Sequence, residues 1–179
     1  MRQLRTLTAL AATASLALAA APGAFAKTSG VGNSNGTPNL NLCLSQIKCT
    51  YFNTKNGKPT DVIKRTGTVT DWSVNAGSVS GFVRLRILRP IGGGSYKFVR
   101  SSAVHTVTLI GRNTFTAHIP VRAGDVLALG NDTSGIYMTQ ANFGTNIRYF
   151  EPSLKDGASG MPNQVAPGAR LLISAHVKS

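Results

Sequence analysis

Residues 82–88 read Phe-Val-Arg-Leu-Arg-Ile-Leu, so apolar and charged side chains alternate along the stretch. Successive side chains of a β-strand point to opposite faces, and this alternation therefore predicts a strand. Its inner face would carry Val83, Leu85 and Ile87. Arg84 and Arg86 are expected on the outer face. A helix would instead need apolar residues three and four positions apart.

Alternating runs of this kind recur from residue 49 onward, separated by Gly, Asn and Asp. The other predicted strands are 68–74, 96–100, 105–110, 114–120, 125–129, 136–140, 147–150 and 171–177. No stretch keeps a helical period for three turns. About nine short strands predict an all-β fold, in which two antiparallel sheets pack as a jelly-roll-like β-sandwich.

Two of these runs predict a hairpin. Strands 105–110 and 114–120 are separated only by Gly-Arg-Asn at 111–113. A short Gly/Asn turn between two alternating runs is a typical hairpin signal.

Residues 1–26 predict an N-terminal signal peptide. Arg2 and Arg5 precede an uncharged Ala/Leu run, and Ala24-Phe25-Ala26 has the small-x-small pattern of a cleavage site. The alternative is a membrane anchor, but the run is shorter than the ~20 strongly apolar residues that a spanning helix needs. We therefore expect a secreted, extracellular protein.

The rest of the chain predicts one domain without a transmembrane segment. Residues 27–40 are rich in Gly, Ser, Asn and Thr, which predicts a flexible leader. Residues 41–179 are then expected to form a single β-sandwich domain, acting as a monomer.

The two cysteines, Cys43 and Cys49, predict a disulfide that closes a small loop. A redox pair or two metal ligands are the alternatives. The spacing is wider than that of Cys-x-x-Cys sites, and no further Cys or nearby His completes a zinc set. We expect no metal and no cofactor.

The chain is strongly basic, with 19 Lys and Arg against 6 Asp and Glu and a formal net charge of +13. Outside a cell this excess favours anionic partners, such as wall polymers, acidic polysaccharide, lipid headgroups or nucleic acid. The alternative is that the charge serves only solubility and loose ion binding, and it is favoured because the basic residues are spread along the chain rather than clustered. Among the partners, nucleic acid is the weakest expectation.

Three stretches resemble a group of uncharacterised secreted bacterial proteins. They are Thr-Val-Thr-Asp-Trp-Ser-Val at 68–74, residues 82–90 with the triple glycine 92–94, and Ile-Pro-Val-Arg-Ala-Gly-Asp-Val-Leu-Ala-Leu at 119–129. That group is similar to jelly-roll or galactose-binding-like β-sandwiches. The resemblance covers residues 49–177 and implies a fold, without catalytic residues.

No catalytic motif stands out. The histidines His105, His118 and His176 have no spacing that brings them to a carboxylate, and no complete Gly-x-Ser-x-Gly motif occurs. Asp132 lies in an oxygen-rich loop that could hold calcium, but a polar hairpin loop is the favoured interpretation because no acidic cluster surrounds it. We expect a protein that is not an enzyme, with a hydrolase as the weaker alternative.

The best candidate for a binding site is a basic patch on strands 82–88 and 96–100, paired across Gly92-Gly-Gly94. Its predicted members are Arg84, Arg86, Lys97 and Arg100, with Tyr96 beside them. The parallel N–H donors of an arginine guanidinium group match the oxygens of carboxylate and phosphate groups. A solvated strand face is the alternative. Trp72, the single tryptophan, is expected in the core.

These features together predict a non-catalytic secreted protein that binds carbohydrate of the extracellular space or cell envelope, either neutral or anionic, or another anionic polymer. The alternative is a structural or accessory exported protein that acts through protein–protein contacts.

Overall fold

Strands are the only regular elements that the computed structural model describes, over residues 26–43, 48–133 and 137–179. In chain order they are β1 Thr28–Asn33, β2 Cys49–Lys55, β3 Lys58–Pro59, β4 Gly67–Ala76, β5 Phe82–Gly92, β6 Ser95–Ser101, β7 His105–Thr106, β8 Gly111–Val121, β9 Val126–Asn131, β10 Thr139–Ala141, β11 Asn146–Phe150, β12 Ser159–Gly160, β13 Gln164–Ala166, β14 Ala169–Leu171 and β15 Ile173–Lys178. The predicted all-β class is confirmed.

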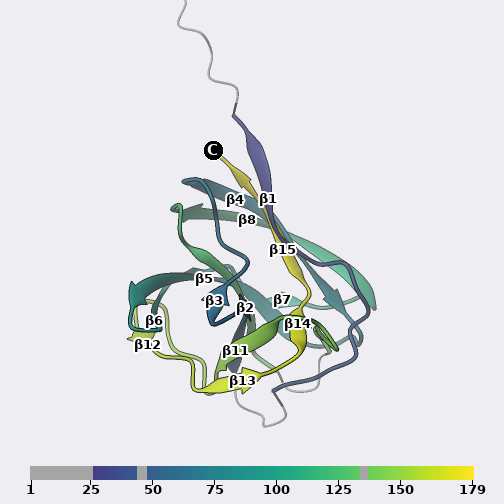
Figure 1. Cartoon of the computed structure of the whole chain (residues 1–179). Coiled ribbons are helices and arrows are strands. Elements are labelled where there is room, and N and C mark those ends of the chain that lie inside the picture. Colours follow the sequence, from purple (N-terminus) through teal and green to yellow (C-terminus); the bar gives the residue numbers. More distant parts are fainter. Residues whose placement is uncertain (1–25, 44–47, 134–136) are drawn as a thin grey trace, which may run out of the picture.

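The strands pair into several antiparallel sheets (Figure 1). A four-stranded sheet has the order β1-β15-β4-β8, and the largest sheet has the order β12-β6-β5-β9-β2-β11-β13. Strands β3 and β7 join the large sheet at β2 and β5, while β10 and β14 form a separate pair. The large sheet curls into a half-barrel in the lower part of Figure 1.

The main core lies where the inner sides of both larger sheets meet. The alternation in β5 is confirmed, because Val83, Leu85 and Ile87 are fully buried. They share one apolar cluster with Trp72 of β4, which is also fully buried as expected.

A second apolar cluster covers the outer side of the large sheet. It consists of Phe52, Leu88, Tyr96, Phe98, Val126, Ala128 and Phe150. Leu154, in the segment after β11, packs against it. The outer face of this sheet is therefore covered in part by protein rather than by solvent. This arrangement decides how deeply the arginines of β5 are buried.

The predicted 105–120 hairpin is wrong. β7 comprises only His105–Thr106 and pairs with β5, whereas β8 begins at Gly111 and pairs with β4. The buried side chain of Asn113 binds the backbone of the preceding loop: its Oδ1 accepts the amides of Thr108 and Leu109. The loop amides are thus satisfied by a side chain instead of by a hairpin partner.

The predicted flexible leader is also wrong in part. Residues 28–33 of this segment form β1, which pairs with β15 over its whole length. Val31 is the buried residue of β1, so the strand contributes to the core as well as to the sheet. The expected signal peptide falls almost entirely on residues 1–25, outside the part of the chain that the structure describes.

The predicted disulfide is confirmed. The sulfur atoms of Cys43 and Cys49 lie 2.07 Å apart, and both residues are fully buried. No helix occurs among the described residues, and hence none that could cross a bilayer.

Candidate functional site

The candidate site is built on two arginines of the same strand face. Arg84 and Arg86 lie two residues apart on β5 and point to the outer side of the large sheet. Gly130 of the neighbouring strand β9 lies beneath them. A Cβ atom at Gly130 would stand only 2.8 Å from Arg84 Cγ and 2.8 Å from Arg86 Nε. The glycine thus leaves room for both side chains to lie against the sheet.

Arg84 is held by a buried carboxylate. Its Nε donates a hydrogen bond of 2.7 Å to Asp132 Oδ2, and its Nη2 donates to the same oxygen. Lys48 Nζ lies 3.9 Å from the other oxygen, Asp132 Oδ1. The Asp132 side chain is 6% exposed, so its charge is balanced by cations at short range.

Arg86 is buried and incompletely partnered. Its side chain is 7% exposed. Nη1 donates 2.9 Å to the carbonyl oxygen of Leu154 and lies 3.4 Å from Asp156 Oδ1. The guanidinium carbon stands 5.3 Å from the centre of the Phe98 ring. Burial lowers the pKa of Arg86, and the charge of Asp156 opposes that effect. The Nε atom is buried without a hydrogen-bond partner.

These groups line a cavity of about 380 Å³. Its lining residues are Lys48, Arg84, Arg86, Asp132, Ser153, Leu154, Lys155 and Asp156. Four side chains are basic and two are acidic, so the cavity is cationic overall. Its free N–H donors and positive charge suit a carboxylate or a phosphate group.

The structure brings together only two of the five predicted site residues. The pairing of β5 with β6 across the triple glycine is confirmed. Lys97 is exposed on β6, outside the cavity. Arg100 lines a different hollow, together with Arg89 and Arg122.

Arg86 faces the outer side of the sheet as expected, but neither it nor Tyr96 is accessible there. Tyr96 is 4% exposed, and its ring packs against Phe52 with the ring centres 4.8 Å apart. Arg86 is covered by the segment around Leu154. The physical reason is the same for both, because the outer face of the large sheet carries its own apolar cluster.

Sequence reasoning missed the other members of the cavity. Lys48 precedes β2, and Lys155 and Asp156 follow β11, so each is distant from β5 along the chain. No local spacing connects them to the arginines. The one available signal was the sequence Lys-Asp at 155–156, in a long irregular segment.

Asp132 pairs with cations in this structure. Its Oδ2 accepts two hydrogen bonds from Arg84, while Oδ1 is buried without a hydrogen-bond partner and lies 3.9 Å from Lys48 Nζ. A bound calcium ion would have to displace these partners.

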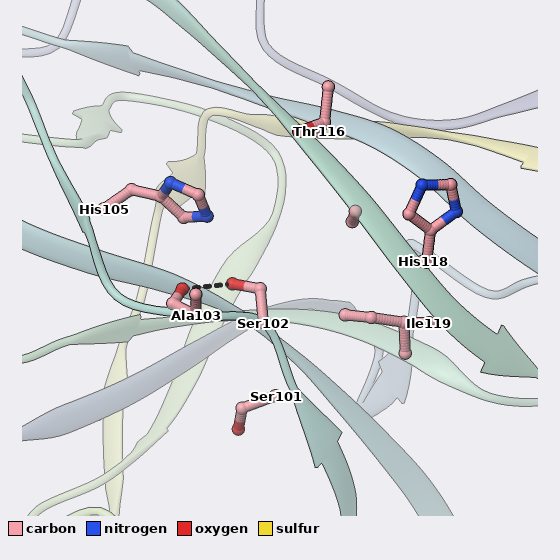
Figure 2. Close-up of a pocket in the computed structure, with 8 residues that line it drawn as sticks. Ser101, Ser102, Ala103, His105, Thr116, His118 and Ile119 are labelled. Atoms are coloured by element: carbon pink, nitrogen blue, oxygen red, sulfur yellow. Dashed lines mark hydrogen bonds between the residues drawn. The ribbon is translucent and has the colours of Figure 1, made fainter.

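A second hollow, of about 390 Å³, lies between β8 and the segment that joins β6 to β7 (Figure 2). His105 and His118 stand at opposite sides of it in Figure 2. Ser102 Oγ donates 2.7 Å to the carbonyl oxygen of Ala103 and accepts the Leu85 amide at 3.0 Å. None of the described residues that line this hollow is acidic. It therefore lacks the acidic member of a Ser-His-Asp triad, and Ser102 donates to a backbone carbonyl rather than to a histidine.

The His105 side chain packs against two aromatic rings. Its centre lies 4.5 Å from that of Phe115 in a stacked arrangement and 5.8 Å from that of Trp72. Burial lowers the pKa of this imidazole. Its Nε2 is buried without a hydrogen-bond partner.

One histidine does meet a carboxylate, which the sequence did not reveal. His176 Nδ1 lies 2.6 Å from Asp71 Oδ1 across neighbouring strands β15 and β4. Both side chains lie on the exposed side of the four-stranded sheet. Asp71 Oδ2 also accepts a hydrogen bond from Thr70 Oγ1. We assign the pair to the surface polar network of this sheet.

One group of potential metal ligands comes close together among the described residues, namely Cys43, Cys49 and Glu151. The two sulfur atoms are bonded to each other, so neither is a thiolate that could bind a metal ion.

Comparison with known proteins adds no relative, since no protein family, curated protein or solved structure matches this chain. The resemblance to jelly-roll proteins stays a prediction from the sequence.

Proposed function

We propose that this chain is an exported, non-catalytic binding protein that takes the anionic groups of an extracellular or cell-envelope polymer into the Arg84–Arg86 cavity. The observation that carries the proposal is the state of Arg86. Its side chain is more than nine-tenths buried, and its ion-pair partner, Asp156 Oδ1, lies 3.4 Å from Nη1 on a side chain that is 46% exposed. A buried charge is costly unless it is well paired, and an anion in the cavity would add negative charge beside the guanidinium.

Three further features support export and architecture. The leader-like sequence 1–26 and the Cys43–Cys49 disulfide fit an oxidising compartment outside the cytoplasm. The apolar cluster shared by the two larger sheets fits a jelly-roll-like β-sandwich in a single, monomeric domain.

Binding measurements with defined polymers test the proposal. We expect the protein to bind polygalacturonate or polyphosphate in isothermal titration calorimetry, and a neutral glucan more weakly. Arg86→Gln should weaken binding about tenfold or more, because a charge-assisted hydrogen bond is worth about 1.5–3 kcal/mol. Lys48→Gln and Lys155→Gln should also weaken it, and both side chains are exposed enough to be replaced without unfolding.

The matched control is Arg100→Gln. It removes the same charge from a neighbouring strand, outside the cavity, and should change the affinity about twofold or less. Equal losses for Arg86→Gln and Arg100→Gln would show that only the net charge matters. Absence of binding to every anionic polymer at low salt would overturn the proposal.

A further inference from the structure

Several large apolar side chains are exposed together where β4 ends and β8 begins, at the right of Figure 1. We name this group the apolar loop end. Its members are Val79, Phe82, Leu109, Ile110 and Tyr137. Ile110 is 74% exposed and Leu109 is 59% exposed. Adjacent aliphatic residues with so much exposure are a feature that a soluble surface does not require.

Backbone contacts show that these loops are neighbours. Ser80 N donates 3.0 Å to the carbonyl oxygen of Val107, and Val107 N donates 2.8 Å to that of Gly81. Gly77 N donates 2.8 Å to the carbonyl oxygen of Tyr137. The backbones of segments 77–82 and 107–110 and of residue 137 therefore lie next to one another.

The exposure of Leu109 and Ile110 is enforced by the fold. The buried amide of Asn113 accepts hydrogen bonds from the Thr108 and Leu109 amides, at 3.2 and 3.1 Å. Its Nδ2 donates 2.7 Å to the carbonyl oxygen of Leu109 and 3.1 Å to that of Gly111. Four hydrogen bonds thus fix the loop in a shape that holds both aliphatic side chains in water.

The loops around Leu109 and Ile110 carry basic but no acidic residues, while Asp132, whose backbone amide donates to the carbonyl oxygen of Phe82, is paired with Arg84. Segments 77–82 and 104–113 contain no Asp or Glu, and Arg112 is exposed directly beside the loop. Phe82 lies on the same strand face as Arg84, two residues away. Apolar tips with basic flanks match the layered chemistry of a bilayer surface, which has anionic headgroups above hydrocarbon.

We propose that the apolar loop end docks on a lipid surface that contains anionic headgroups, with Leu109 and Ile110 inserted below the headgroups. A protruding tip needs no complementary groove in a fluid bilayer, whereas a protein partner would have to provide one. The chain's charge complements such a surface, and its apolar tips account for attachment that charge alone would not give.

Vesicle co-sedimentation tests this docking. The protein is purified after export and its mass is measured, because a retained apolar leader would itself bind lipid. We expect it to sediment with phosphatidylglycerol–phosphatidylcholine vesicles and more weakly with phosphatidylcholine alone. The double variant Leu109→Ser, Ile110→Ser should partition about tenfold or more weakly. The control Met161→Ser, Val165→Ser removes two exposed apolar side chains outside these loops and should bind as the unaltered protein does.

A second measurement covers the case in which the double variant fails to fold. Trp72 is fully buried, so Ile110→Trp adds an exposed reporter. Its emission should shift to shorter wavelength with phosphatidylglycerol vesicles. An unchanged spectrum, or no sedimentation of the unaltered protein with either vesicle, would overturn the proposal. So would a dimer that the double variant converts to a monomer without any binding to vesicles, since that outcome would assign the surface to protein contact.

Discussion

A single buried amide joins distant parts of the chain. Asn53 of β2 donates from Nδ2 to Asp61 Oδ2 at 2.7 Å and to the carbonyl oxygen of Leu171 at 2.9 Å. Its Oδ1 accepts the Leu171 amide at 2.6 Å. Burial raises the pKa of Asp61, and the bond from Asn53 acts against that effect. Residue 53 therefore satisfies polar groups of β14 and of the loop after β3 at once.

We expect Asn53→Ala to lower the free energy of unfolding by about 2–3 kcal/mol, because it leaves buried polar groups without partners. Urea unfolding followed by fluorescence measures the change. Asn163→Ala is the matched control. Asn163 also bonds a backbone amide and carbonyl, both of Glu151, but it is exposed. A loss of less than 1 kcal/mol at Asn53 would contradict the role of burial.

His105 predicts a loss of stability in acid. Burial lowers its pKa below the ordinary value of 6.5, so the unfolded chain binds the proton first as the pH falls. Well above pH 6.5, His105 is neutral in both states and does not change the free energy of unfolding. Below pH 6.5, the free energy of unfolding falls progressively. His105→Phe keeps an aromatic ring beside Phe115 and should reduce the drop in melting temperature between pH 7.5 and 5.

The control for that experiment is His118→Phe, which changes an exposed histidine of the same hollow. It should show the same acid-dependent drop as the unaltered protein. If both variants behave alike, the burial of the imidazole is not the cause.

At the scale of elements, alternation predicted which residues face the core but not which strands pair. In β15 every second residue is buried as the sequence indicates. In β5 Val83, Leu85 and Ile87 are buried as predicted, but Arg86 and Leu88 are buried as well. The pairing of β8 with β4 was not predictable, because the local pattern of 105–120 fits a hairpin equally well. β8 pairs with β4 rather than with β7 because Asn113 binds the loop before β8 and because β4 lies beside β8 in the folded protein. Both reasons depend on tertiary structure, which the local sequence does not show.

The disulfide ties the segment before β2 to the first residue of that strand. Cys43 and Cys49 are separated by only six positions, so the closed loop is short. We expect the double variant Cys43→Ser, Cys49→Ser to lose about 2 kcal/mol of stability, mainly through greater entropy of the unfolded chain. Differential scanning calorimetry with and without reductant measures this loss. A variant that reductant still destabilises would show that the effect has another cause.

At the scale of the whole molecule, the excess of basic residues predicts binding that depends on salt. We expect affinity for polygalacturonate to fall about tenfold or more between about 0.05 and 0.5 M NaCl, because counterions screen the attraction. Binding to a neutral glucan should change little over that range. An affinity for polygalacturonate that is insensitive to salt would argue against recognition of its charge.

The candidate site could be predicted only in part, because its burial depends on the fold of the whole molecule. Arg84 and Arg86 follow from local alternation, which places them on one face. The burial of Arg86 does not, because it depends on a segment some seventy residues later that folds over the sheet. An outward position in a strand indicates which side a residue faces, while the rest of the fold decides whether that side meets water.

The pairing of β1 with β15 has a consequence for the order of assembly. Sheet order β1-β15-β4-β8 places the last strand between the first strand and β4. During synthesis β1 emerges early and has no place in its sheet until β15 follows. Contacts that span the chain in this way close large loops and slow folding. The four-stranded sheet is thus completed only after the residues of β15 have been made.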